Sequence, residues 1–195
     1  MAEIPLFPLR TVLFPGGLLP LRIFEARYVD MVGRCMREGG EFGVLLVKSG
    51  GEAGQVDDLA GTGTCARIVD FSKLPDGLLG LMCVGTRRFR LDSYRAQDDR
   101  LLLGEVQWIA EPPRVALPAE HEQLVPVLKS VVERLGALAS HLQPDWTDAG
   151  WVANRLAEFL PLDRASQQQL LEMEDPVERL SLLAPLVDTS AMGGH

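Results

Sequence analysis

One group of side chains that could bind a ligand surrounds Phe24. Arg22 and Arg27 supply guanidinium groups, Glu25 supplies a carboxylate, and Tyr28 supplies a ring with a hydroxyl. Guanidinium groups match the geometry of carboxylates and phosphates, and aromatic rings bind apolar or planar groups. Two interpretations stay open for this group. Either it binds a ligand, or its charges form an ion pair that fixes a helix against a sheet.

A second group is the basic run around Phe89. Arg87, Arg88 and Arg90 flank this aromatic ring, a combination that surfaces for single-stranded RNA use. Alternation along a strand instead predicts that Phe89 points inward and that the arginines point outward, where nearby acids neutralise them. We favour the second interpretation and keep RNA binding as an alternative.

No catalytic or metal-binding pattern is recognisable in the sequence. The chain has no G-x-S-x-G elbow, no P-loop and no H-E-x-x-H zinc motif. Its three histidines, His121, His141 and His195, are far apart and are expected to be solvated. The Gly-rich segment 48–58 lacks the lysine of a P-loop, so we expect a surface loop there. We therefore expect a protein that is not an enzyme and needs neither a cofactor nor a metal.

Composition favours a globular protein of the cytoplasm. Apolar residues make up 47% of the chain, which is typical of a folded domain. No apolar run approaches the ~20 residues of a membrane helix, and the N-terminus lacks the pattern of a secretory signal. Cys35, Cys65 and Cys83 form no C-x-x-C pair, which favours reduced thiols buried in a core. The net charge of −8 would repel phosphates, so nucleic acid is not the expected partner.

Short apolar runs separated by turn residues predict strands in the first half of the chain. The turn Pro75-Asp76-Gly77 predicts a hairpin, because Pro presets one turn position and Gly accepts a positive φ. Helical spacing predicts one interrupting helix over 24–37, ended by Gly39-Gly40. The expected strands are 41–47, 62–71, 78–84, 88–91 and 101–108.

Beyond the proline-rich stretch 111–118 the apolar period becomes helical. One apolar face runs from Leu124 to Leu138, and further helices are expected after Thr147 or Asp148, after Asp163 and after Asp175. The sequence therefore predicts an α+β protein. Its expected parts are a β-rich subdomain at 1–115 and a subdomain of bundled α-helices at 116–195.

Four segments near the N-terminus join short apolar runs to regularly placed prolines. They are Pro5–Arg10, Leu13–Gly16, Leu19–Leu21 and Ile23–Tyr28. Together they resemble the start of the N-terminal, substrate-recognising domain of Lon-type ATP-dependent proteases. Supporting similarities lie at Gly61–Ile68, Gly85–Phe89 and Leu170–Leu180. The resemblance implies a pseudobarrel similar to the PUA fold, followed by a helical bundle.

The resemblance also implies a function. Full Lon proteases continue into an ATPase with a P-loop and a protease domain with a serine-lysine dyad, and this chain shows neither motif. It therefore resembles free-standing members of the family. We expect a non-catalytic module that binds unfolded or degron-bearing polypeptides, alone or as an adaptor to a separate protease.

Several alternatives remain beside this expectation. A PUA-like module could bind RNA, and a pocket between barrel and helices could bind a small molecule. A homodimer formed through a helical face also stays open. The expected peptide site comprises Arg22, Phe24, Glu25, Tyr28, Arg87 and Arg88.

Overall fold

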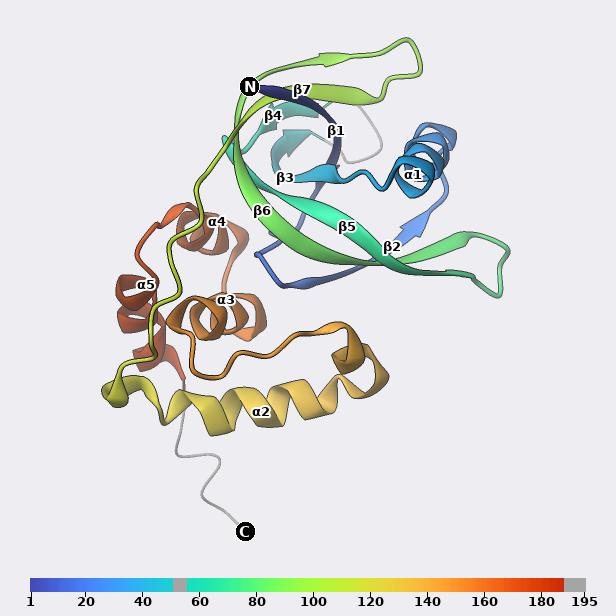
Figure 1. Ribbon diagram of the computed structural model, residues 1–195. Helices are drawn as coiled ribbons and strands as arrows, with labels where there is room; N and C mark the ends of the chain where they lie inside the picture. Colours follow the sequence, from blue (N-terminus) through green and yellow to red (C-terminus); the bar gives the residue numbers. More distant parts are fainter. Residues whose placement is uncertain (51–55, 188–195) are drawn as a thin grey trace. The chain divides into compact units, whose positions relative to one another are not determined.

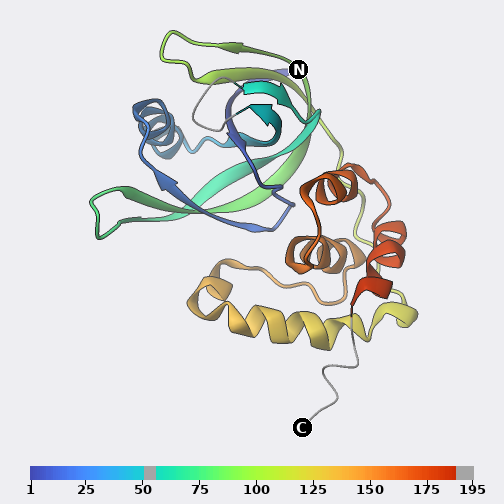
Figure 2. The same cartoon turned by 180° about the vertical axis from the view of Figure 1, so that it is seen from behind.

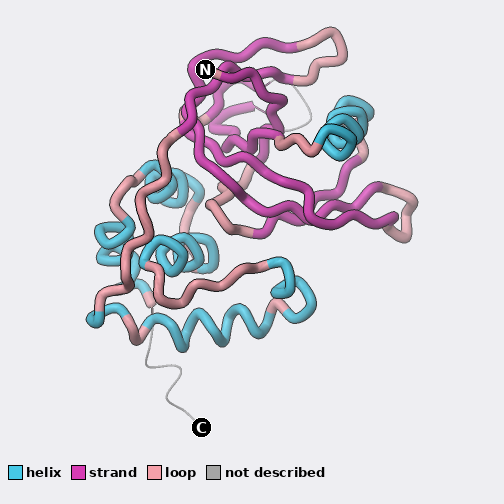
Figure 3. The backbone as a smooth tube through the Cα atoms, in the orientation of Figure 1, coloured by secondary structure: helices cyan, strands magenta, loops and turns pink. Residues whose placement is uncertain are grey.

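Strands dominate the first part of the chain and helices the second in the computed structural model, which describes residues 1–50 and 56–187 (Figure 3). The chain divides into two compact units, Met1–Ala110 and Glu111–His195. The predicted α+β class, with a β-rich part followed by a helical part, is confirmed. The junction expected at 115 and 116 falls within the extended stretch that begins the second unit.

The first unit is built on a seven-stranded sheet that closes on itself. The order β1-β7-β6-β5-β3 becomes a ring because β1 also pairs with β3, in parallel, from Leu6↔Gly43 to Leu9↔Leu46 (Figure 1). Outside the ring, β4 pairs with β3 and β2 pairs with β6. The strands are β1 (Ala2–Leu9), β2 (Leu18–Ile23), β3 (Phe42–Gly50), β4 (Val56–Leu59), β5 (Thr62–Lys73), β6 (Leu79–Ala96) and β7 (Leu102–Trp108).

Strand β6 is longer than predicted. The two strands expected at 78–84 and 88–91 are one continuous strand, which pairs with β2, β5 and β7. Its register against β5 shifts between Thr64↔Arg88 and Ala66↔Gly85, so that Thr86 and Arg87 together face one residue of β5. A bulge of this kind lets a strand bend without ending.

The prediction of a loop over residues 48–58 is wrong at both ends. Strand β3 continues to Gly50 and β4 begins at Val56, because the two strands pair with each other through irregular registers. The rest of that prediction, residues 51–55, lies outside the described residues. The predicted hairpin turn is confirmed: Gly77 has a φ of 85° and joins the antiparallel strands β5 and β6.

Helix α1 (Ala26–Glu38) lies against the sheet beside β2 and the β5–β6 hairpin, as both ribbon views show (Figures 1 and 2). It buries one face, formed by Tyr28, Met31, Val32 and Cys35, and ends at Gly39 with a φ of 65°. A second core cluster includes Leu6, Leu45, Phe89 and Val106. Cys35, Cys65 and Cys83 are buried free thiols, as predicted.

Side-chain caps begin three helices of the second unit. The carboxylate of Asp148 accepts the Trp151 N–H, that of Asp163 accepts the Ser166 N–H, and that of Asp175 accepts the Val177 N–H. The helices are α2 (Leu124–Arg134), α3 (Ala149–Phe159), α4 (Arg164–Glu172) and α5 (Pro176–Leu183), with short 3₁₀ turns η1 (Ala119–His121), η2 (Gly136–His141) and η3 (Ala184–Leu186).

Two expectations for this unit need correction. Helix α2 stops at Arg134, short of Leu138, because Gly136 adopts a φ of 57° and the chain tightens into η2. His121 is buried with 8% of its surface exposed, so the expectation that it is solvated is wrong.

Over residues 1–50 and 56–187, no helix has the length and apolar character needed to cross a membrane.

Candidate functional site

The polar group around the start of α1 is tied together by Arg27. Its Nε donates to Glu25 Oε2 at 2.9 Å, and its Nη1 donates to the Arg100 carbonyl at 2.8 Å. The guanidinium carbon lies 4.6 Å from the centre of the Tyr28 ring. These contacts link the start of α1 to the turn between β6 and β7. They support the interpretation that an ion pair fixes this helix.

The other expected site residues of this group point to different places. Tyr28 is buried, with its ring stacked on Phe7 at 4.0 Å between centroids. Arg22 forms an ion pair with Asp76, in the β5–β6 turn. Phe24 is 65% exposed, so it alone of these three offers an open apolar surface.

The basic run around Phe89 differs from the alternation argument at one position. Phe89 is fully buried as expected, but Arg88 is buried too, with 2% of its surface exposed. Arg88 lies opposite Thr64 on β5, and the Thr64 hydroxyl donates to the Leu13 carbonyl at 2.6 Å. The opening loop (residues 10–17, between β1 and β2) therefore covers this face of the sheet, which the alternation argument took as facing water.

Arg87 is the expected site residue that lines a hollow. The bulge in β6 places it beside Trp108 and Glu41, with its guanidinium carbon 3.5 Å from the Trp108 ring centroid. Its Nε lies 3.8 Å from Glu41 Oε2, which is longer than a hydrogen bond. The hollow has a volume of about 550 Å³, and its lining includes Gly40, Glu41, Arg67, Thr86, Arg87 and Trp108.

Two further residues decide the chemistry of the hollow. Arg67 is exposed, and its side chain has no hydrogen bond or ion pair within residues 1–50 and 56–187. Burial raises the pKa of Cys65, which also lines the hollow, to about 12. Because the thiolate is the nucleophilic form, this cysteine is inert at neutral pH. The hollow can bind an anion through its guanidinium groups, but Cys65 gives it no nucleophile.

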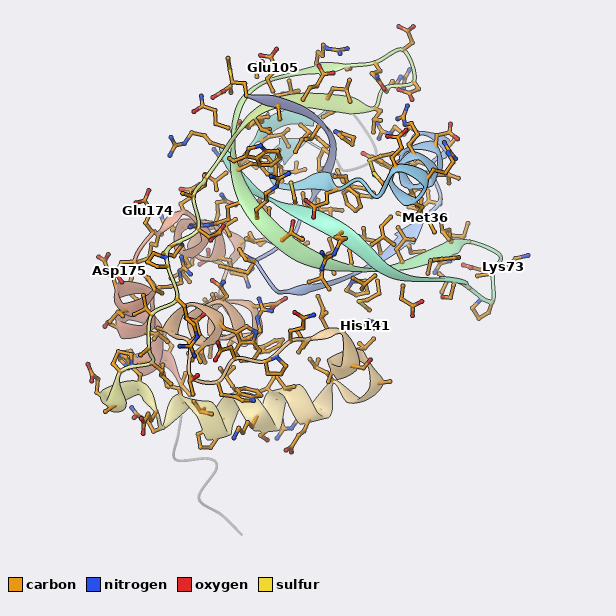
Figure 4. All side chains as sticks on the ribbon, viewed as in Figure 1. Met36, Lys73, Glu105, His141, Glu174 and Asp175 are labelled. Carbon is orange, nitrogen blue, oxygen red and sulfur yellow. The ribbon has the colours of Figure 1, made fainter. Side chains whose placement is uncertain are left out.

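The hollow lies beside an open strand edge. Strand β3 pairs with β5 only from Thr64 to Ala66. From Arg67 to Lys73, no strand among the described residues pairs with the edge of β5 that faces away from β6, although the Phe71 N–H donates to Asp70 Oδ1 at 2.8 Å. Val69 and Phe71 on this stretch are 39% and 58% exposed. Figure 4 shows Lys73 near the tip of the hairpin that carries this edge.

Sequence reasoning missed Glu41, Arg67 and Trp108. They come from three separate parts of the chain, and the sheet register brings them together: Trp108 lies opposite Phe89, and β3 begins to pair with β5 at Phe42↔Ala66. Their residue types alone carry no signal of this. Within the described ranges, 1–50 and 56–187, no cluster of three His, Cys, Asp or Glu side chains could hold a metal ion.

A sequence model of the ATP-dependent protease La (LON) substrate-binding domain matches residues 3–189. The chain belongs to this family. It is 29% identical to a Lon protease of Vibrio parahaemolyticus over 93% of its length, and 27% identical to that of Escherichia coli K12 over 96%. It spans about a quarter of the length of these curated relatives.

Solved structures of this family share the fold. A Lon N-terminal domain protein from Xanthomonas campestris has a TM-score of 0.79 and 38% identity, over 96% of this chain and all of that one. The N-terminal domain of a Mycobacterium avium complex Lon protease has a TM-score of 0.63 at 22% identity, over 97% of this chain and 98% of that one. The resemblance inferred from the N-terminal proline-spaced segments is confirmed.

Proposed function

We propose that this protein is a polypeptide-recognition module that binds protein substrates without catalysing a reaction. The observation that carries the proposal is membership of the Lon substrate-binding family across residues 3–189. The buried, protonated Cys65 in the hollow agrees with a binding role. Unfolded or degron-bearing polypeptides are the proposed partners.

The open edge of β5 offers a physical means of binding. An extended polypeptide can add to such an edge through backbone hydrogen bonds, while side-chain pockets supply specificity. The stretch from Arg67 to Lys73 has no strand partner on this side within the described residues. The exposed ring of Phe71 gives apolar contact area beside it.

Fluorescence anisotropy of a labelled unfolded polypeptide tests this proposal. Binding should persist from low to moderate salt, because backbone hydrogen bonds and apolar contacts are weakly screened. The Phe71→Ala variant should bind about fivefold to tenfold more weakly, since an aromatic contact is worth roughly 1 kcal/mol. Tyr94→Ala is the matched control, because Tyr94 is 41% exposed on the part of β6 that pairs with β7 and should leave affinity unchanged.

Two outcomes would contradict the proposal. If no unfolded polypeptide binds the folded protein at low salt, the recognition role is wrong. If a single-stranded RNA binds instead, with an affinity that falls steeply as salt rises, a nucleic-acid module replaces it. The burial of Arg88 removes one of the three arginines on which that alternative depended.

A further inference from the structure

The hollow lined by Arg67 and Arg87 begins where β3 stops pairing with β5. The first pair between these strands is Phe42↔Ala66. The residue before Phe42 is Glu41 and the residue after Ala66 is Arg67, and both line the hollow. The open edge of β5 therefore starts at the hollow and leads away from it toward Lys73.

The direction of β3 fixes which end of an added strand reaches the hollow. Strand β3 is antiparallel to β5 and leaves the hollow as it pairs with Ala66, Cys65 and Thr64. A polypeptide that adds to the free edge in the same antiparallel orientation runs from Lys73 toward Arg67. Its C-terminal end then meets the hollow. The added strand cannot extend further along β5, because β3 pairs with that edge from Phe42↔Ala66 onward.

The charges of the hollow suit a carboxylate. The Arg67 side chain has no hydrogen bond or ion pair among the described residues, and the Arg87 guanidinium carbon lies 3.5 Å from the centroid of the Trp108 ring. Glu41 is the acidic residue of the lining, and it lies beyond hydrogen-bond distance from Arg87 Nε. Two guanidinium groups thus face one carboxylate, and charge-assisted bonds from arginine to a carboxylate are among the strongest in proteins.

We propose that the hollow binds the α-carboxylate of a polypeptide whose last residues add as a strand to the free edge of β5. Arg67 and Arg87 bind the carboxylate, and the exposed part of the Trp108 ring contacts the final side chain. This inference rests on the proposed function and names its substrate class: chains recognised by their free C-terminal end.

Three labelled peptides of one extended apolar sequence test the inference. One ends in a free carboxylate, the second in an amide, and the third continues through several Gly-Ser residues. The peptide with the free carboxylate should bind about tenfold more tightly than the other two, which corresponds to about 1.4 kcal/mol. Equal affinity of all three would overturn this inference and leave the proposed function intact. Absence of binding by all three, and by an unfolded protein, would overturn both.

Matched variants show whether the guanidinium groups are responsible. Arg67→Gln should lower the affinity of the free-carboxylate peptide toward that of the amide peptide, with the remaining preference due to Arg87, and should leave the amide peptide unchanged. Arg90→Gln removes another exposed arginine, one outside the lining, and should alter neither peptide. Equal weakening of both peptides by Arg67→Gln would overturn the carboxylate assignment.

The Glu41→Gln substitution should change the affinity for the free-carboxylate peptide in the opposite direction. The Glu41 carboxylate competes with the ligand for Arg87, so its removal should strengthen binding of the free-carboxylate peptide about threefold. The amide peptide should bind as before. A weaker free-carboxylate peptide in this variant would contradict the proposed competition.

Discussion

The substitution Gly85→Ala should destabilise the barrel more than its size suggests. A methyl group at Gly85 would lie well inside van der Waals contact with the Phe14 carbonyl oxygen and 3.1 Å from Leu13 Cγ. Two backbone hydrogen bonds clamp this site: Gly16 N donates to Gly85 O at 2.8 Å, and Gly85 N donates to Gly17 O at 2.9 Å. The opening loop therefore cannot move away from β6 without stretching both bonds.

These contacts set the expected magnitude. Overpacking a tight site costs about 1–3 kcal/mol, and each weakened hydrogen bond adds about 1 kcal/mol. Alanine has less conformational freedom than glycine in the unfolded chain, and this offsets roughly 0.4–1 kcal/mol of the lost stability. The free energy of unfolding should thus fall by about 3 kcal/mol, a large share of the 5–15 kcal/mol typical of a domain.

Urea unfolding followed by tryptophan fluorescence measures this change. Trp108 reports on the first unit when Trp146 and Trp151, both in the second unit, are replaced by phenylalanine. With a slope of about 2 kcal/mol per molar urea, the midpoint should fall by about 1.5 M. Gly61→Ala is the control, because its methyl group would meet no atom within 4 Å. A Gly85→Ala midpoint equal to that of Gly61→Ala would refute the reasoning.

Three further predictions concern single side chains. Burial raises the pKa of Cys65 to about 12, so native protein should react with iodoacetamide far more slowly there than unfolded protein, as peptide mass spectrometry would show. Arg114 donates to Asp145 at 2.8 Å and lowers the pKa of that carboxyl. This ion pair therefore stabilises the folded state at pH 7, and the stabilisation is lost as pH falls below the usual aspartate pKa of about 3.9. Thermal unfolding should therefore give a higher melting temperature for the wild type than for Asp145→Asn at pH 7, and this difference should disappear in acid. Thr64→Val should cost about 1–2 kcal/mol in urea unfolding, because it leaves the buried Leu13 carbonyl without this donor.

Local patterns predicted the elements whose cause is local. The β5–β6 turn followed from Pro75-Asp76-Gly77, and the start of α5 followed from Asp175 and the proline after it. The end of α1 followed from Gly39. In each case a backbone angle or a nearby hydrogen bond decides the structure, and neighbouring residues specify both.

The candidate site could not be predicted in the same way. Sequence alternation around Phe89 identifies the side of the strand on which each residue lies, but not what covers the other side. Arg88 is buried because a loop 75 residues away in sequence, at Leu13, lies over that face. Likewise, Arg67 joins Arg87 only through the bulge in β6. Pairing between distant strands determines both results, and a single sequence contains no direct record of it.

The pairing of β1 on both sides has a consequence for synthesis on the ribosome. Strand β1 is made before the other strands of this unit, yet one of its partners, β7, ends at Trp108, with Ala2 opposite Val106. The ring cannot close until nearly the whole first unit has left the exit tunnel, and such long-range pairing is slow to form. A nascent chain halted before β7 would therefore carry exposed strand edges, and this unit should depend on chaperones most strongly at that stage of its translation.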